Sequence, residues 1–130
     1  MICLDTSSLI AFLGGDTGND VETVDQTLQD QEGVIAPVTL TELLSDPKLP
    51  RTLRETIFHL PVLPVTEGYW ERAGLTRAKI LRAGRKAKLA DTLIAQICID
   101  HRVMLVTRDK DFLVFHRLAG LKLLGSDSSN

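Results

Sequence analysis

Apolar residues in this chain form short unbroken runs that alternate with longer segments of helical periodicity. The runs include MICL at the start, VIA at 34–36 and VMLV at 103–106. Short apolar runs of this kind predict strands buried on both faces, as in parallel sheets. Apolar residues recur with helical spacing between them, which predicts helices over 7–13, 21–33, 37–45, 51–59, 67–83 and 89–101. The pattern predicts an α/β fold, a three-layer α/β/α sandwich with a central, mostly parallel sheet.

Cap and turn residues add detail to this interpretation. We expect Thr66 to cap the helix that follows it, and we expect that helix to bury Trp70 and Leu81. The prolines of PVLPV at 61–65 predict a short edge strand or an extended connector, because proline cannot donate a hydrogen bond to a central ladder. LKLLG at 121–125 predicts a final strand.

The length and composition predict one globular domain. The chain has 130 residues, of which 44% are hydrophobic and 25% charged, so we expect a single domain over 1–124 and a flexible polar tail over 125–130. No run approaches the roughly 20 apolar residues that cross a bilayer, and no basic region precedes the first apolar run. We therefore expect a cytoplasmic protein without membrane contact, in which Cys3 and Cys98 are small buried side chains.

Charge is distributed unevenly along the chain. Residues 1–47 contain nine acids and no Lys or Arg, whereas the remaining 83 residues carry all 15 Lys and Arg against 8 of the 17 acids. Seven basic residues and no acid lie between Glu71 and Asp91. This basic segment is either a solvated face or a surface for a polyanion, which clustered cations bind by releasing phosphate counterions.

Several acids stand at the ends of apolar segments. Asp5 follows the first predicted strand, and Asp109 follows the late one in the sequence LVTRDKDF. Ligands of parallel sheets bind beyond the carboxyl ends of the strands, so these two acids can meet at one site. Glu42, Asp91 and Asp111 also lie at the edges of apolar segments, which directs them toward the rim of the core.

Close, half-buried carboxylates repel one another, and a cation is needed to stabilise such a cluster. All-oxygen ligands favour a hard ion, Mg²⁺ or Mn²⁺. A zinc site is disfavoured because the three histidines have no ligand spacing. Structural alternatives remain open: Asp5 or Asp91 as a helix N-cap, and Glu42 as a solvated helix carboxylate.

The hydroxyl residues beside these acids are interpreted as supporting groups. Thr6, Ser7 and Thr107 are expected to cap helices or to orient the carboxylates, since no pattern of a serine nucleophile accompanies them. One aspartate of TRDKDF is expected to cap a helix that begins near Phe112, while the other faces the site.

Taken in order, LDTSSLI, TELL, LADTLIAQ and LVTRDKDF closely resemble the PIN-domain nucleases, and specifically the VapC toxins of prokaryotic toxin–antitoxin modules. The resemblance spans residues 1 to about 124 and implies a PIN-like fold. By position it implies that the catalytic, metal-binding acids are Asp5, Glu42, Asp91 and Asp109, with Asp111 as a supplementary ligand. The implied cofactor is one or two ions of Mg²⁺ or Mn²⁺.

The implied activity is that of a metal-dependent endoribonuclease, in which a metal-activated water hydrolyses the RNA phosphodiester bond. Glu42 or Asp111 would orient or deprotonate this water. Arg108 would contact a phosphate or form a surface ion pair. The remaining RNA-binding candidates are Arg82, Arg85, Lys86 and Lys88. The expected partners are single-stranded or loop RNA, a cognate VapB-like antitoxin that inhibits the enzyme, and a second copy of the chain in a homodimer.

Two rival functions make different predictions. A phosphatase or receiver domain would use Asp5 as a nucleophile or phosphate acceptor. However, Ser7 stands where such a phosphatase has a second aspartate, and Lys110 comes only after Asp109 and not at the end of the late strand, where a receiver has its lysine. A non-catalytic PIN-like module would bind RNA or protein without cutting. Degenerate modules lose some of the acids, whereas every acidic position of the pattern is filled here.

Overall fold

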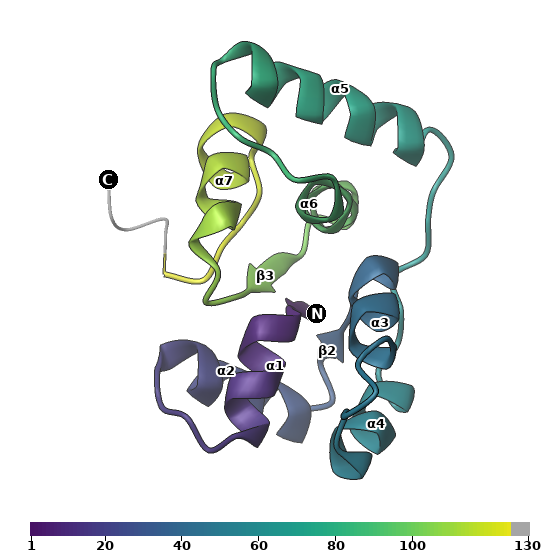
Figure 1. The fold of residues 1–130 in the computed structure, drawn as a ribbon, viewed down its shortest axis with the longest axis vertical. Coiled ribbons are helices and arrows are strands. Elements are labelled where there is room, and N and C mark those ends of the chain that lie inside the picture. The colour runs from purple at the N-terminus through teal and green to yellow at the C-terminus, as the bar shows by residue number, and fades with distance from the viewer. Residues whose placement is uncertain (126–130) are drawn as a thin grey trace.

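Three short parallel strands form the centre of the computed structural model, which describes residues 1–125 (Figure 1). β1 (Ile2–Leu4) lies between β2 (Gly33–Val34) and β3 (Met104–Val106), so that the strand order is β2-β1-β3. Cys3 pairs with Val34 on one side and with Leu105 on the other. The parallel sheet is as predicted. Apart from Gly125, the expected polar tail lies outside the described residues.

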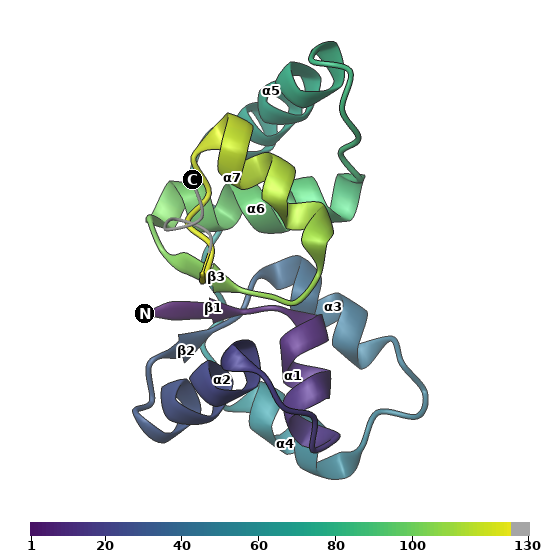
Figure 2. The ribbon, with the colours of Figure 1, turned by 90° about the vertical axis from the view of Figure 1, so that its left-hand side faces the viewer.

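Helices cover both faces of this sheet. They are α1 (Thr6–Leu13), α2 (Asn19–Gln29), α3 (Pro37–Leu44), α4 (Arg51–Phe58), α5 (Tyr69–Arg82), α6 (Leu89–His101), the 3-10 helix η1 (Lys110–Phe112) and α7 (Leu113–Ala119). Figures 1 and 2 show α5, α6 and α7 on one side of the strands and α1, α2 and α4 on the other, which gives the predicted three layers. Within residues 1–125, no helix combines the length and the apolar character that a membrane span requires.

Alternate residues of each strand contribute to two separate cores. Cys3 and Leu105 face the layer of α5, α6 and α7, where they join a cluster that includes Ile94 and Phe115. The next residues, Leu4 and Val106, face the opposite layer. Successive strand side chains point to opposite faces, so three-residue strands buried on both sides must be apolar throughout. Each apolar run therefore serves both cores.

The start of α5 differs from the prediction. Gly68 is the residue before the helix, in the left-handed conformation, whereas the Thr66 hydroxyl accepts a hydrogen bond from Arg72 Nη2 at 3.0 Å. Trp70 and Leu81 are not buried, because 62% and 47% of their surfaces are exposed. The helical spacing was correct, and Tyr69, Ala73 and Ile80, which the same spacing predicts as buried, do form the buried face of α5.

Two predicted strands are reduced to single bridges. Val62 in the PVLPV segment forms one parallel bridge with Ile35, and Leu123 forms one with Leu105. The segment at 61–65 is thus mainly an extended connector, one of the two alternatives. The final segment extends the sheet edge by a single pair of residues instead of a full strand.

Candidate active site

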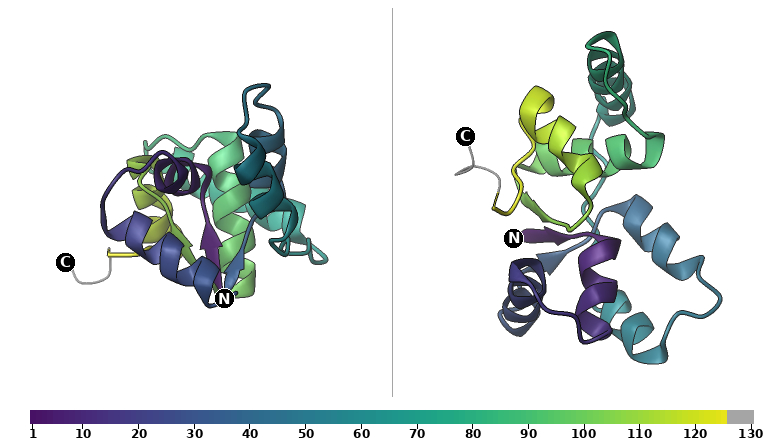
Figure 3. Two further views of the ribbon diagram at one scale, coloured as in Figure 1. Left: turned by 90° about the horizontal axis from the view of Figure 1, so that it is seen from below. Right: turned by 60° about the vertical axis from the view of Figure 1, so that its left-hand side comes forward.

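The carboxyl ends of β1 and β3 bring the first and last acidic segments together. Both strands run toward the side where α1 and η1 begin (Figures 2 and 3). Leu4 pairs with Val106, and the backbone N–H of Asp5 donates to the Val106 carbonyl at 3.0 Å. The turn that follows β3 carries Thr107 and Asp109 and therefore lies directly beside Asp5.

Asp5 is a buried carboxylate with one oxygen fully engaged. Only 5% of its surface is exposed. Its Oδ2 accepts from Ser7 Oγ at 2.7 Å, Thr107 Oγ1 at 2.8 Å and the Ser7 backbone N–H at 3.4 Å. The last contact makes Asp5 the N-cap of α1. Among residues 1–125, no donor reaches Oδ1, so this oxygen is available to a ligand while Oδ2 fixes the orientation of the carboxylate.

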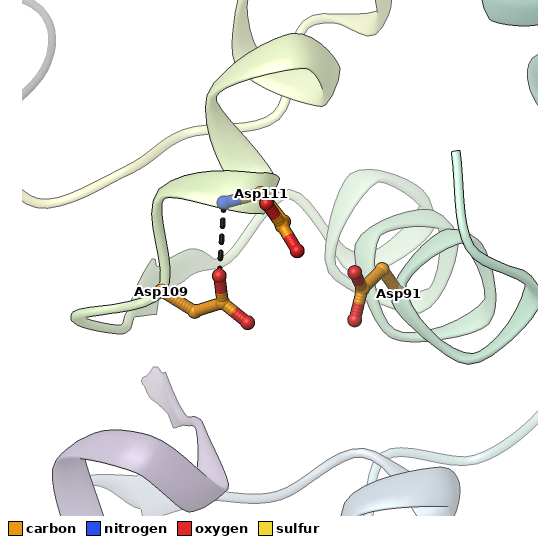
Figure 4. Close-up of side chains that lie close together, drawn as sticks. All are labelled: Asp91, Asp109 and Asp111. Atoms are coloured by element: carbon orange, nitrogen blue, oxygen red, sulfur yellow. Dashed lines mark hydrogen bonds between the residues drawn. The ribbon is translucent and has the colours of Figure 1, made fainter. Parts of the chain in front are cut away.

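Three further acids converge between α6 and η1. Asp91, Asp109 and Asp111 each offer a carboxylate oxygen, and these oxygens lie within 4.8 Å of one another. Figure 4 shows Asp91 pointing from α6 toward the two aspartates of the late turn. Asp109 caps η1 by accepting from the Asp111 backbone N–H at 2.9 Å. We refer to Asp91, Asp109 and Asp111 as the acidic triad.

The triad perturbs the ionisation of Asp91. Burial is the largest cause, followed by the charge of Asp109, and together with smaller effects of Asp111 and Asp5 they raise the pKa of Asp91 to about 6. Lys88 opposes this rise through its positive charge. Asp91 lies in the first turn of α6, after the N-cap Lys88, so it is not itself the N-cap. At neutral pH the cluster therefore holds repelling charges that a cation would stabilise.

Glu42 interacts electrostatically with Asp5 and is not a member of the acidic triad. Partial burial and then the charge of Asp5 raise the pKa of Glu42. The Thr6 hydroxyl has no partner in hydrogen-bonding geometry among residues 1–125, yet it lies near enough to Glu42 to oppose this rise in part. The charge of Asp5 raises the pKa of both Glu42 and Asp91, so Asp5 interacts electrostatically with Glu42 and with the triad.

The donor set suits a hard divalent cation. The candidate ligands Asp91, Asp109 and Asp111 are all carboxylates, which matches the preference of Mg²⁺ and Mn²⁺ for oxygen ligands. The histidines are occupied elsewhere: His59 contacts the Glu55 carbonyl and His101 the Pro64 carbonyl, while His116 contacts the Leu121 carbonyl. The residues present therefore fit a magnesium or manganese ion and do not fit a histidine-bound zinc ion.

A basic cleft of about 480 Å³ adjoins the triad. Asp91 and Asp111 form part of its wall, and its basic lining residues are Arg85, Lys86, Lys88, Lys110 and Arg117. Lys88 Nζ lies 3.1 Å from Asp111 Oδ2, so this ion pair joins the basic cleft to the acidic triad. Arg77 Nε donates to the Ala87 carbonyl at 2.8 Å and so fixes the segment that carries three of these cations.

The basic candidates from the sequence separate into two groups. Arg85, Lys86 and Lys88 line the cleft, whereas Arg82 does not. Arg108 forms the ion-pair alternative, with Asp16 and Asp20 as partners. Sequence reasoning did not include Lys110 and Arg117, because only the tertiary packing of η1 and α7 brings these two residues to the cleft.

The family of the chain follows from comparison with known proteins. The family model described as the PIN domain matches residues 2–121. This chain belongs to the PIN domain family. Two curated relatives are VapC ribonuclease Mb1587 of Mycobacterium bovis and ribonuclease VapC11 of Mycobacterium tuberculosis. Each is 32% identical to this PIN domain over 133 residues, covering 94% of this chain and 96% of the relative, so the PIN domain belongs to the VapC family.

Solved structures share the fold of this PIN domain. VapBC-1 of nontypeable Haemophilus influenzae has a TM-score of 0.69 and 22% identity, over 95% of this chain and 96% of that one. VapBC2 of Rickettsia felis, solved with a DNA fragment from its promoter, has a TM-score of 0.68 and 18% identity, over 95% and 97% of the two chains. At these identities the likeness concerns the fold alone, and it confirms the predicted PIN-like architecture.

Proposed function

We propose that this PIN domain is a metal-dependent endoribonuclease of the VapC type. Three observations support the proposal: the VapC ribonucleases at 32% identity, the convergence of the acidic triad, and the basic cleft beside it. The convergence of three carboxylates is the observation that carries most of the argument, because a negative cluster next to a polyanion site requires a cation.

Each acid has a proposed role. Asp5 Oδ1 and the acidic triad would hold one or two ions of Mg²⁺ or Mn²⁺. A bound ion supplies positive charge at the scissile phosphate and a water of lowered pKa. Ser7 and Thr107 hold Asp5 through its other oxygen, so that the free oxygen keeps a fixed direction. No covalent intermediate with the protein is required.

Glu42 is the proposed acceptor of the water proton. Its pKa is raised by burial and by Asp5, which makes it a stronger base than a solvated glutamate. Asp111, the alternative acceptor, belongs to the acidic triad and forms an ion pair with Lys88 at 3.1 Å. Glu42 is not a member of the acidic triad, so its carboxylate would be available for proton transfer.

The basic cleft would bind the phosphates of single-stranded RNA. A splayed strand can bring one phosphate toward Asp91 and Asp111 while neighbouring phosphates contact Arg85 and Lys86. Replacing Arg85 and Lys86 by alanine should raise KM several-fold and leave kcat within about twofold. In a plot of log KM against the logarithm of the salt concentration, the slope should become less steep by about one unit for each phosphate that the variant no longer neutralises.

The activity test uses a single-stranded RNA oligonucleotide pool with Mg²⁺ or Mn²⁺, in parallel with EDTA. Water attack with departure of the 3′ oxygen predicts products with 5′-phosphate and 3′-hydroxyl ends. Asp5→Asn should abolish cleavage and keep the folded state by circular dichroism. Asp25→Asn is the matched control, since Asp25 is an exposed acid on α2 that contacts only Gln29 among residues 1–125.

Two outcomes would contradict the proposal. Cleavage that continues in EDTA and leaves 2′,3′-cyclic phosphate ends would show attack by the RNA 2′-hydroxyl, the mark of a metal-independent ribonuclease. Equal inactivity of the wild type and Asp5→Asn, with RNA still bound, would favour a non-catalytic RNA-binding module.

We further propose a cognate antitoxin as the inhibitor of this chain, together with a cytoplasmic location and a homodimer. VapBC-1 and VapBC2, the solved relatives of the same fold, are VapBC systems. The all-acidic first 47 residues favour a basic partner segment. Affinity for the antitoxin should therefore fall as salt rises, and an affinity that is indifferent to salt would contradict the electrostatic part of the proposal. Light scattering of the isolated chain tests the homodimer.

A further inference from the structure

Arg108 lies between Thr107 and Asp109, yet its guanidinium is bound to the segment that joins α1 and α2. Nε donates to Asp20 Oδ2 at 2.8 Å, and Nη2 donates to Asp20 Oδ1 at 3.0 Å. Nη2 also donates to the Thr17 carbonyl at 3.1 Å, and Nη1 contacts Asp16 Oδ2 at 3.4 Å. These contacts occupy four of the roughly five N–H groups of the side chain, which leaves little capacity for a phosphate.

The acceptor of this pair is itself fixed. Asp20 Oδ2 accepts a second hydrogen bond from Ser8 Oγ at 2.8 Å, and Ser8 is fully buried on α1. The Arg108 contact is the largest cause that lowers the pKa of Asp20 to about 2, so the carboxylate stays charged at every physiological pH. Gly18 allows the Asp20 carboxylate to lie close to the backbone of the α1–α2 segment. A Cβ at position 18 would lie 2.8 Å from Asp20 Oδ1, and the backbone there has a φ of +139°.

The backbone around Arg108 connects this pair to the metal-binding candidates. The Arg108 N–H donates to Ser7 Oγ at 3.2 Å, and Ser7 Oγ donates to Asp5. The next N–H, of Asp109, donates to Thr107 Oγ1 at 3.0 Å, and Thr107 also donates to Asp5. One continuous hydrogen-bond network therefore extends from Asp20, at the start of α2, to Asp5 and to the backbone N–H of Asp109.

We propose that Arg108 is a positioning residue of this nuclease, whose two-pronged pair with Asp20 holds the turn after β3 so that Asp109 meets the other acids. The inference rests on the proposed function and deepens it. Arg108 acts through the backbone of its own turn and contacts neither RNA nor metal. Groups that orient metal ligands commonly affect metal affinity or activity 10- to 100-fold, roughly.

Arg108→Lys tests this role, because lysine keeps the charge but cannot form the planar two-pronged contact. We expect the Kd for Mn²⁺, measured by titration calorimetry, to rise about tenfold. We expect kcat for RNA cleavage to fall by a similar factor while KM changes less than twofold. Amide hydrogen exchange in the segment 107–111 should accelerate in the metal-free protein. Asp20→Asn changes the other partner of the pair and should alter the Kd for Mn²⁺, kcat and amide hydrogen exchange in the same way.

Arg72→Lys is the matched control. Arg72 forms an equivalent pair with Asp100, at 3.0 Å from Nε and 2.7 Å from Nη2, and its side chain is 42% exposed against 36% for Arg108. This pair connects α5 to α6 and is separate from the turn after β3. Arg72→Lys should lower the melting temperature about as much as Arg108→Lys, without a change in Mn²⁺ affinity or in exchange at 107–111.

The outcomes separate this inference from the proposed function. If wild-type protein neither binds Mn²⁺ nor cleaves RNA, the proposed function fails and the positioning role fails with it. If the wild type does both, and Arg108→Lys and Asp20→Asn retain its Mn²⁺ affinity and kcat, the positioning role alone is refuted. Equal losses in Arg72→Lys would also refute it, because the effect would then be one of general stability.

Discussion

The two acidic groups of this PIN domain are stabilised in opposite ways. At the end of β1, Asp5 is almost fully buried, and three donors contact one of its oxygens. Between α6 and η1, the oxygens of the acidic triad face one another within 4.8 Å, and their repulsion contributes to raising the pKa of Asp91 to about 6. Asp5 is held by hydrogen bonds from the protein, whereas Lys88 compensates the charge of the triad only in part.

This difference assigns distinct roles to the two groups. Hydrogen bonds to an ionised carboxylate favour its charged form, while neighbouring carboxylates disfavour it. On the proposed function, Asp5 would be a metal ligand of fixed orientation at the strand ends, and a bound cation would relieve the repulsion within the triad.

Asp5→Asn should have the largest effect on activity. Loss of the charged oxygen removes a metal ligand at the scissile phosphate, so kcat for RNA cleavage should fall on the order of 10³-fold. Single-turnover cleavage at saturating Mn²⁺ measures this loss. Residual activity above about a tenth of the wild-type value would show that Asp5 is only the N-cap of α1.

The hydroxyl pair should come next. Ser7→Ala with Thr107→Val removes the side-chain donors that orient Asp5, and Mn²⁺ affinity should fall roughly 10- to 100-fold. Titration calorimetry checks the affinity, and Thr41→Val is the control, because the Thr41 hydroxyl contacts the Pro37 carbonyl on α3 instead. Wild-type affinity in the double variant would show that Asp5 needs no orientation by these donors.

The pH dependence of metal binding should reflect Asp91. Its pKa of about 6 in the metal-free protein means that a proton competes with the metal below that pH. The affinity for Mn²⁺ should be nearly constant above pH 6 and fall by up to about tenfold for each pH unit below it. Titrations between pH 5 and 8 test this, and a midpoint near pH 4 would contradict the raised pKa.

Asp91→Asn should stabilise the metal-free protein at neutral pH. The pKa rises from 3.8 to about 6 on folding, so the folded state binds the proton more tightly, and stability declines as pH rises from about 4 to 6 and then stays level. Removing the charge should recover about 1 kcal/mol at pH 7.5, after allowance for solvent screening of this half-buried group.

Urea unfolding in EDTA at pH 7.5 and at pH 4 measures this change. The gain should shrink toward pH 4, where the wild-type Asp91 is already protonated when folded. A variant that is destabilised at pH 7.5 would contradict a net repulsion within the triad.

The hydrophobic pattern predicted most of the architecture, and the carboxyl ends of the predicted strands located two of the acids. Apolar runs bounded by polar residues were sufficient to predict the parallel sheet, and the residues that follow them include Asp5 and Asp109. Local sequence predicted the buried face of α5 only in part. Tyr69 is buried as expected, but Trp70 fits the helical spacing equally well and is exposed, because only tertiary packing selects between them.

The finer parts of the site depend on contacts between distant segments. Arg108 and Asp20 are 88 residues apart, and Ser7 and Thr107 are 100 apart, so neither pairing leaves a periodic signal in the chain. The cap at Gly68 was missed for a related reason. Thr66 is a favourable N-cap residue by type, but here its hydroxyl accepts from Arg72.

Binding of Mn²⁺ to the wild type and to Asp91→Asn, compared by titration calorimetry at pH 7.5, tests the central claim most directly. If the acidic triad forms a divalent-cation site, the wild type binds one or two ions, and the variant, which we expect to be folded and more stable without metal, binds at least about tenfold more weakly. Equal affinities in the two proteins, or the absence of binding by the wild type, would contradict a metal centre at these strand ends.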